Sequence, residues 1–171
     1  MQIVACNGSV NFHDVSRLET VRVARVIRVR NADEIRRAIN EACANHLKVS
    51  IAGARHSQGG QSYVTNGVIL DMTSYYRVLH VNPSTRIMTV ESGATWDHVQ
   101  AAANQINLAV EVMQSSNIFT IGGSLSVNAH GRDPHYGSIV DIRWNSEKCI
   151  KTRKFSAISI GHRWLWVCIF I

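Results

Sequence analysis

The stretch GARHSQGG, residues 53–60, decides the fold of this chain. It holds Arg55, His56 and Ser57 between glycines, directly after the apolar run VSIA. Glycine permits backbone angles and close approaches that side chains block, and successive backbone N–H groups in such a turn form an anion-binding concavity. The stretch therefore predicts a phosphate-binding loop, to which Arg55 adds charge and Ser57 and Gln58 add hydrogen bonds.

The segments around this loop predict parallel strands joined by a helix. RVIRV (25–29) alternates in the manner of a strand, and VSIA (49–52) and VILDM (68–72) are typical of buried strands. NADEIRRAINEACANH (31–46) has helical spacing, with Asn31 as its N-cap. A strand, helix, strand order implies a parallel pair with the helix on one face, and ligands bind beyond the carboxyl ends of such strands.

From residue 77 onward the pattern changes to a hairpin followed by a second helix. RVLHV and RIMTVESG flank the turn NPST, and Thr95 then caps the helix TWDHVQAAANQ. The apolar stripe of this helix is interpreted as core, and it consists of Val99, Ala102, Ala103 and Ile106. The segment 111–133 follows, with a short helix-like centre.

This later segment repeats the composition of the first loop. Its small, hydroxylated or side-chain-free residues surround the expected helix start, and they are Ser115, Ser116, Thr120, Gly122, Gly123 and Ser126. A helix start of this kind suits the other side of a pyrophosphate. Neither segment has the GxxxxGK pattern of nucleoside triphosphate loops or the GxGxxG pattern of dinucleotide-binding Rossmann domains, so both of those interpretations lose support.

Four motifs in one order carry a family resemblance. VSIAGARHSQGG, VILDM, VESGATWDHVQ and SSNIFTIGGSLSVNAHG together resemble the FAD-binding domain of the vanillyl-alcohol oxidase/p-cresol methylhydroxylase (PCMH) flavoprotein family. The resemblance covers residues 17–142 and is closest to the branch with alditol and sugar-lactone oxidases. It implies an α+β, PCMH-type fold of two α/β lobes, of which the second is incomplete here.

The resemblance also implies FAD as the cofactor and a set of residues that bind it. In the family the first loop wraps the pyrophosphate, and the second segment runs along the pyrophosphate, the ribityl chain and the flavin ring. The implied cofactor-binding residues are Ala52, Gly53, Ala54, Arg55, His56, Ser57, Gln58, Ser115, Ser116, Thr120, Gly122, Gly123, Ser126, Asn128, His130 and Gly131. Family members oxidise an alcohol or sugar-type carbon with the flavin, so the chain is expected to be the FAD-binding portion of such an oxidoreductase.

His56 is the candidate for a covalent bond to the flavin. Many relatives link the matching histidine to the C8-methyl group, whereas others replace it and hold FAD without a bond. The alternatives for His56 are therefore a covalent link, a noncovalent flavin contact or an ordinary loop histidine. Ala54 and Arg55 stand where many relatives have smaller residues, and Arg55 fits a surface ion pair as well as a phosphate contact.

The sequence identifies no catalytic residue and no metal site. His130 is interpreted as a buried structural histidine beside a glycine rather than as a catalyst. His130, Asp133 and His135 carry metal-binding groups, but no second cluster with metal spacing accompanies them.

Composition places the chain in the cytoplasm as one compact unit. Its 171 residues suffice for a core, and four widely spaced cysteines without a CxxC pair indicate free thiols. Cys43, on the apolar face of the first helix, is expected in the core of the protein. No apolar run approaches the roughly 20 residues that span a bilayer, so no membrane span is expected.

The last 29 residues differ from the rest. Residues 1–142 carry a net charge of +1 and residues 143–171 a net charge of +5, together with three of the four tryptophans. This tail has no clear helical or strand period. We expect an N-terminal segment (1–16), the partial FAD-binding domain (17–142) and an atypical tail (143–171) from a disrupted reading frame, which makes the chain a truncated flavoenzyme.

Three functions follow from these expectations. The first is the FAD-binding portion of the oxidoreductase, inactive by itself because the substrate domain is absent. The second is a noncatalytic remnant that at most binds FAD. The third is a basic interaction module driven by the tail, but the tail shows no nucleic-acid-binding motif, so no nucleic acid is expected as a partner. A small alcohol or sugar would be a substrate only of a full-length relative.

Overall fold

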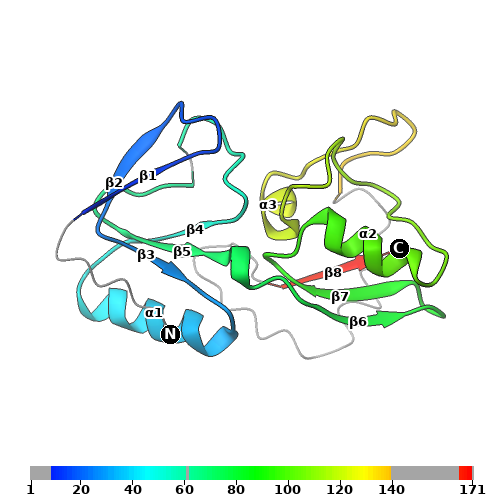
Figure 1. Cartoon of the computed structure of the whole chain (residues 1–171), viewed down its shortest axis with the longest axis horizontal. Coiled ribbons are helices and arrows are strands. Elements are labelled where there is room, and N and C mark those ends of the chain that lie inside the picture. Colours follow the sequence, from blue (N-terminus) through cyan, green and yellow to red (C-terminus); the bar gives the residue numbers. More distant parts are fainter. Residues whose placement is uncertain (1–8, 61, 140–165, 171) are drawn as a thin grey trace. The chain divides into compact units, whose positions relative to one another are not determined.

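The computed structural model describes residues 9–60 and 62–139, and the backbone of 166–170. The chain divides into two compact units, one ending at Tyr75 and one beginning at Tyr76 (Figure 1). Within the described ranges, no helix has both the length and the apolar character needed to cross a bilayer.

The first unit contains the predicted parallel sheet. Its strands are β3 (Arg25–Arg28), β4 (Val49–Ala52) and β5 (Val68–Asp71), all parallel, in the order β3-β5-β4. The sequence places these strands correctly, but the expected direct pairing of the first two is wrong because β5 lies between them. Val68, Ile69 and Leu70 in β5 are all fully buried, which explains why this strand occupies the centre.

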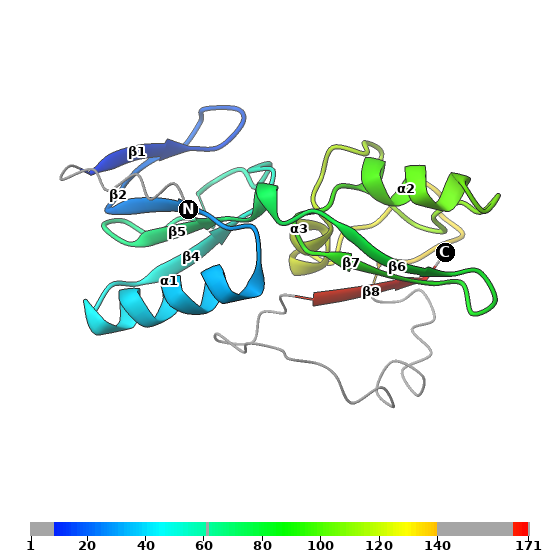
Figure 2. The ribbon, with the colours of Figure 1, turned by 60° about the horizontal axis from the view of Figure 1, so that its bottom comes forward.

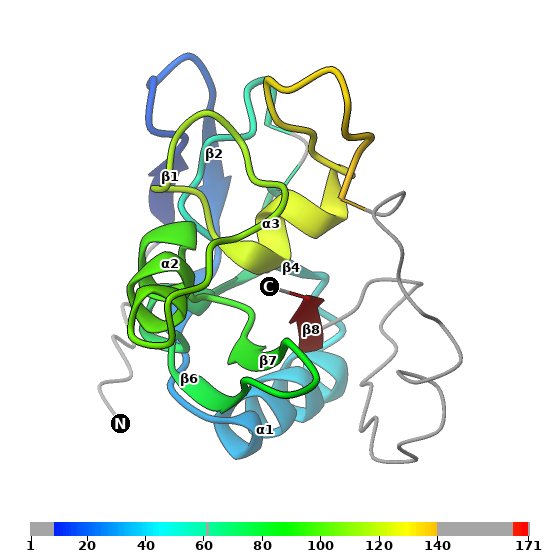
Figure 3. The ribbon, with the colours of Figure 1, turned by 90° about the vertical axis from the view of Figure 1, so that its right-hand side faces the viewer.

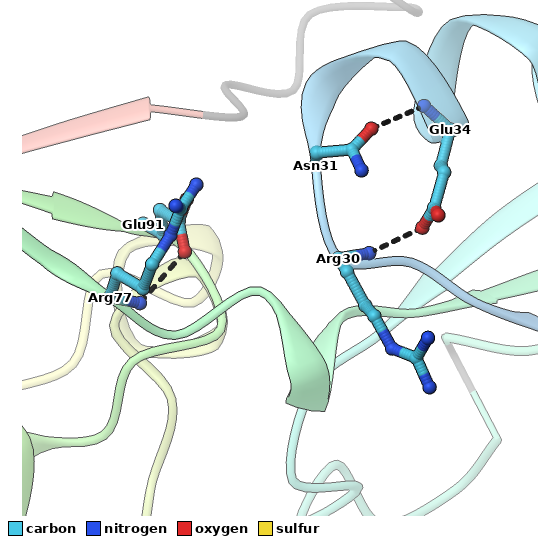
Figure 4. A network of polar contacts seen from close by, with 5 residues as sticks. All are labelled: Arg30, Asn31, Glu34, Arg77 and Glu91. Atoms are coloured by element: carbon cyan, nitrogen blue, oxygen red, sulfur yellow. Dashed lines mark hydrogen bonds and ion pairs between the residues drawn. The ribbon is translucent and has the colours of Figure 1, made fainter. Parts of the chain in front are cut away.

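Helix α1 (Ala32–Ala44) covers one face of this sheet. Its N-terminus is the predicted one, because the Asn31 side chain accepts a hydrogen bond from the Glu34 N–H at 2.9 Å. The Glu34 carboxylate in turn accepts the Arg30 N–H at 2.8 Å (Figure 4). Two backbone N–H groups at the start of the helix thus have side-chain partners.

Cys43 is not in the core. It is an exposed free thiol, whereas the buried side chains of α1 are Ile35, Ala38 and Ala42. Successive helical residues are about 100° apart around the axis, so Cys43 turns away from the face that Ala42 buries. The prediction for this residue was therefore wrong.

A hairpin that the sequence analysis missed covers the other face of the sheet. Strands β1 (Val10–His13) and β2 (Thr20–Val23) pair antiparallel, and Figure 2 shows them on the side of the sheet opposite α1. The hairpin packs on the sheet through one buried cluster, which consists of Phe12, Val23, Ala52 and Ile69. Its two strands lie on either side of the expected boundary between residues 16 and 17.

The second unit has a three-stranded antiparallel sheet. The predicted hairpin is β6 (Val78–Asn82) and β7 (Ile87–Glu91), and β8 (Trp166–Phe170) pairs with the other edge of β7. The expectation that the tail lacks strand structure is therefore wrong for β8. The other tail residues, 143–165 and 171, lie outside the described part of the chain.

Two helices lie on one face of this second sheet (Figure 3). Helix α2 (Trp96–Asn104) begins at Thr95 as predicted, with a capping box between Thr95 and His98. Helix α3 is Ile121–Ser126. Between the helices and the sheet lies a buried core that includes Met88, Val90, Trp96, Val99, Ala103 and Ile121. Val99 and Ala103 confirm the predicted apolar stripe.

An ion pair between the exposed Arg77, just before β6, and the buried Glu91 joins the start of β6 to the end of β7. The Glu91 side chain is 1% exposed, and its carboxylate accepts hydrogen bonds from the backbone N–H (2.7 Å), Nε (3.0 Å) and Nη2 (2.7 Å) of Arg77 (Figure 4). Charge-assisted bonds of this kind offset the cost of burying the carboxylate. They fix the start of the segment ESGAT, which leads into α2.

Candidate functional site

The first candidate segment leaves the carboxyl end of β4, as expected. Its last two glycines need their lack of a side chain, because Gly59 and Gly60 have φ angles of 94° and 70°. Gly53 is not among the residues with positive φ. The glycine-rich loop therefore bends at its end, where the backbone follows a path that other residues rarely adopt.

Arg55 is the unexpected residue of this loop. Its φ is 61°, in the left-handed region that favours glycine. Its guanidinium lies 5.3 Å from the centroid of the Phe12 ring, Nη1 donates to the His13 carbonyl at 3.5 Å, and its own carbonyl accepts the Val15 N–H at 3.0 Å. Among the described residues it forms no ion pair. Arg55 thus fastens the loop to the β1–β2 hairpin.

Two polar groups of the first unit are buried, namely the side chain of Asp14 and the hydroxyl of the half-buried Tyr63. Asp14 is 1% exposed; its Oδ1 accepts the Leu18 N–H at 3.0 Å, and its Oδ2 has no partner among the described residues. The buried hydroxyl of Tyr63 also lacks a described partner. Burial raises the pKa of Tyr63 above its ordinary value, and the charge of Asp14 adds to this while Arg55 opposes it. The sequence analysis named neither Asp14 nor Tyr63.

The remaining residues of the first loop differ in exposure. Ala52 is buried at the end of β4, Gly53, Ala54, His56 and Ser57 are half-buried, and Gln58 is exposed. The partial exposure of His56 leaves its side chain within reach of a ligand, as any of its flavin-related roles requires. The loop belongs to the first unit, whereas all candidate residues from Ser115 to Gly131 belong to the second.

In the second unit, the start of α3 is occupied by the protein itself. The Ile121 N–H donates to the Ala94 carbonyl at 2.7 Å, and the Gly122 N–H donates to the Ser92 carbonyl at 2.8 Å. These two N–H groups are therefore not available to an anion. The expectation that this helix start serves a pyrophosphate does not hold for them, because the chain uses them to join α3 to the segment after β7.

Gly122 and Gly123 have different reasons to be glycine. A Cβ on Gly122 would lie 3.0 Å from both the Cβ and the carbonyl oxygen of Ser92, so a side chain there would require Ser92 to shift by a few tenths of an ångström. A Cβ on Gly123 would meet only the Oγ1 of Thr120 within 4 Å, also at 3.0 Å. The Thr120 hydroxyl makes no capping bond. Packing within the described chain thus explains Gly122 better than Gly123.

The end of the segment folds back against its beginning. A Cβ on Gly131 would lie 2.9 Å from the Met113 carbonyl oxygen, which places Gly131 against the chain just before Ser115. Asn128 has a φ of 48° and follows the end of α3, a place where Asn tolerates the left-handed conformation. His130 is exposed, so the expectation that it is buried is wrong, and its Nδ1 donates to the Gly131 carbonyl at 2.8 Å.

A buried polar network that the sequence analysis missed holds Ser115 and α3 in place. The Trp96 Nε1 donates to Gln114 Oε1 at 2.9 Å and to Ser124 Oγ at 3.0 Å, and the Ser124 hydroxyl also bonds Gln114. Trp96 is 1% exposed. Because a buried indole N–H needs a partner, this network fixes the backbone that precedes Ser115.

Ser115 and Ser116 line a pocket of about 430 Å³ between α2 and the segment 113–117. Ser126 does not line it: it is exposed, and its hydroxyl donates to the Gly122 carbonyl at 2.7 Å. The second segment therefore divides into residues that face a cavity and residues that serve the short helix.

The histidine and carboxylate after Gly131 pair with each other. His135 Nδ1 and Asp133 Oδ1 are 2.8 Å apart, and the backbone N–H of His135 also donates to that oxygen at 2.9 Å. Both hydrogen bonds lower the pKa of Asp133, and the bond from the backbone N–H has the larger effect. In the described ranges no group of three or more His, Cys, Asp or Glu side chains could hold a metal ion.

Comparisons with known proteins agree with this geometry. The family model described as "FAD binding domain" matches residues 23–143. The chain is 28% identical over 114 residues to decaprenylphosphoryl-beta-D-ribose oxidase of Mycolicibacterium smegmatis, and 29% identical over 110 residues to an uncharacterized oxidoreductase of Rhodococcoides fascians. These alignments cover 66% and 64% of this chain. The chain spans about a quarter of the length of each relative, since 25% of each is matched.

Among solved structures, cholesterol oxidase from B. sterolicum has the same fold over 72% of this chain and 24% of its own. Its TM-score is 0.60 at 22% sequence identity. The α+β, PCMH-type fold expected from the sequence is therefore confirmed for the matched part of the chain.

Proposed function

The chain belongs to the family of FAD-binding domains. From this premise we propose that its contacts with FAD are residues 52–58 together with Ser115, Ser116, Thr120, Gly122, Gly123, Ser126, Asn128, His130 and Gly131. We propose further that the protein of which these contacts are part oxidises an alcohol, polyol or sugar-type carbon. Bound FAD supplies the two-electron acceptor for such a reaction.

The observation that carries the proposal is the extent of the family match. Residues 23–143 include both glycine-bearing segments and every described strand and helix from β3 to α3. The two segments also have the features that a nucleotide contact needs. The first has successive glycines with positive φ, and the second has a glycine, Gly123, that packing within the described chain does not explain.

The role of the first loop is to surround the pyrophosphate with backbone. Gly59 and Gly60 have the positive φ angles of a tight turn, and consecutive backbone N–H groups in such turns can donate hydrogen bonds to phosphate oxygens. Arg55 adds a positive charge to this loop while its contact with Phe12 limits its motion. A restrained cation loses less conformational entropy when an anion arrives.

The substrate class rests on the names of the relatives. One relative is a decaprenylphosphoryl-ribose oxidase, whose name places the oxidised carbon on a sugar, and a structural neighbour oxidises cholesterol, an alcohol. The chain spans about a quarter of the first of these, so substrate oxidation is proposed for a protein of the relatives' length. The test uses such a full-length protein with bound FAD and adds sugar alcohols in the absence of oxygen. Loss of the flavin's visible absorbance would support the proposal. Persistent colour with all of them would contradict it.

His56 is proposed as the residue that bonds covalently to the flavin. In forming the bond, a methyl C–H at C8 and an imidazole N–H are replaced by an N–C bond, and dioxygen accepts the two electrons and two protons. The test is the intact mass of wild type and His56→Ala after incubation with FAD in air. We expect one FAD adduct on wild type alone. An unmodified wild-type chain that still holds FAD would show that the cofactor is bound noncovalently.

A further inference from the structure

A pocket lies between helix α2 and the segment 113–117. It lies wholly within the second unit and measures about 430 Å³. Pockets for small ligands are typically about 300–1,000 Å³. Ala101 of α2 and Met113 of the facing segment supply apolar wall, and the rest of the lining is polar.

Hydrogen bonds hold the walls of this pocket in a fixed arrangement. Asp97 Oδ1 accepts from Asn117 Nδ2 at 2.7 Å, and the Asp97 N–H donates to the Asn117 carbonyl at 3.0 Å. On the same helix, Gln100 Nε2 donates to Asn104 Oδ1 at 2.7 Å, and Gln100 Oε1 accepts the Val110 N–H at 3.2 Å. Such mutual bonds prepare a site before its ligand arrives, which reduces the entropy lost on binding.

Several polar atoms of the lining are left for a ligand. Asp97 Oδ2, Asn104 Nδ2 and the hydroxyls of Ser115 and Ser116 have no hydrogen-bond partner among the described residues. The carboxylate oxygen can only accept, the amide nitrogen can only donate, and each hydroxyl can do both. The matching ligand must therefore both donate and accept.

The charge of the pocket selects among ligands. Among the described residues that line it, Asp97 alone is charged, and none is Lys, Arg or His. A phosphate would face this carboxylate without a cation to offset the repulsion. An ammonium group would satisfy Asp97 but has no acceptor for Asn104. Neutral hydroxyl groups, which donate to one side and accept from the other, satisfy both walls.

We propose that this pocket binds a neutral polyhydroxylated group, a sugar or a sugar alcohol. The group belongs either to the sugar portion of FAD or to a free polyol, and the proposal does not depend on FAD being bound. It changes the expected task of Ser115 and Ser116, which the sequence assigned to a pyrophosphate. The carboxylate of Asp97 on the facing helix makes hydroxyls the better partner.

The test is a titration of the ¹⁵N-labelled full chain, followed through backbone amide shifts. The probes are ribitol and, separately, inorganic phosphate. We expect ribitol to shift the amides of Asp97, Asn104, Ser115 and Ser116, and phosphate to leave them in place at the same concentration. If phosphate moves these amides at lower concentrations than ribitol does, the proposal is overturned.

Matched variants make the result specific to the pocket. Asp97→Asn removes the charge and should weaken ribitol binding about tenfold, because a hydrogen bond to an ionised group is among the stronger ones. Ser115→Ala tests the opposite wall without touching the bond between Asp97 and Asn117, and should weaken binding as well. Asp133→Asn, at an exposed carboxylate outside the lining, should bind ribitol like wild type. Unchanged affinity in both pocket variants would contradict the assignment.

The source of the hydroxyls follows from one further titration. Flavin fluorescence first reports, independently of the pocket, whether the chain binds FAD. When FAD-saturated protein no longer responds to ribitol, the sugar portion of the cofactor occupies the pocket; when it still responds, the ligand is a free polyol. Either outcome supports the proposal, whereas absence of a ribitol response in the folded chain without FAD refutes it.

Discussion

The guanidinium of Arg55 lies 5.3 Å from the centroid of the Phe12 ring, and this contact joins the glycine-rich loop to the β1–β2 hairpin. The loop holds Arg55 at a φ of 61°, which residues other than glycine, asparagine and aspartate rarely adopt. One residue thus combines a favourable ring contact with backbone strain. The two can be separated by substitution.

Arg55→Gly and Arg55→Ala should differ in stability by about 1 kcal/mol, with glycine the more stable. Both lose the cation–ring contact, which at an exposed site contributes about 0.5–1 kcal/mol. Only alanine keeps the cost of the left-handed conformation. Urea unfolding measures both variants, and equal stabilities would show that the strain at residue 55 is absent.

Gly122→Ala and Gly123→Ala form a matched pair in one helix. The first should destabilise the chain by about 1–3 kcal/mol, because its Cβ meets the Ser92 backbone and side chain at 3.0 Å. The second meets only the Thr120 hydroxyl, which can rotate, and should leave stability unchanged or raise it by up to about 1 kcal/mol. Thermal unfolding of the two variants checks the order.

The same pair separates packing from ligand contact. If Gly123 approaches FAD, Gly123→Ala should lose affinity for FAD while keeping its stability. An FAD titration by fluorescence quenching provides the comparison. Wild-type affinity in a stable Gly123→Ala chain would remove Gly123 from the proposed site.

Arg77→Met should destabilise the chain by about 1–3 kcal/mol, because it removes the two guanidinium hydrogen bonds to the buried Glu91 carboxylate and keeps only the backbone one. The matched control is Arg36→Met, which breaks an exposed pair with Asp33 and should cost under about 1 kcal/mol. Chemical unfolding measures both. A smaller loss for Arg77→Met would mean that the two guanidinium bonds to Glu91 add little.

Tyr63 gives stability a dependence on alkaline pH. Its pKa is raised in the folded chain, so the stabilising effect is fully present below the ordinary value of 10.0 and is lost as pH rises from there through the folded pKa. Tyr63→Phe should remove this part of the alkaline loss. At neutral pH it should be neutral or slightly stabilising, since it removes a buried hydroxyl without a described partner. Unfolding curves of both chains across alkaline pH test this, and identical alkaline losses would contradict it.

Local patterns predicted the elements of the fold well. Asn31 and Thr95 cap the helices that the sequence assigned to them, because capping depends on residues within one turn. The strand order β3-β5-β4 could not be predicted from the sequence, because the order depends on which strand is buried on both faces of the sheet. The prediction for Cys43 was wrong for a related reason. Sequence spacing identifies the apolar face of a helix, but only packing shows how wide the buried part of that face is.

The candidate site was predicted in part. The need for glycine at Gly59 and Gly60 follows from their positive φ, as the loop sequence indicated. Asp14 and Tyr63 were missed because neither belongs to the glycine-rich motif in the sequence. The signal that could have indicated the β1–β2 hairpin was the alternation of apolar residues around Phe12, whose ring contacts that of Tyr63. The sequence analysis did not single out Asp97, whose place in the pocket depends on Asn117, twenty residues away.

The measurement that tests the central claim most directly is the visible absorbance of the purified chain after incubation with FAD and removal of free cofactor. The account predicts one bound FAD per folded chain, with folding verified by circular dichroism. A folded chain that remains colourless at FAD concentrations well above those that saturate flavoproteins would contradict the assignment of the two glycine-bearing segments to FAD.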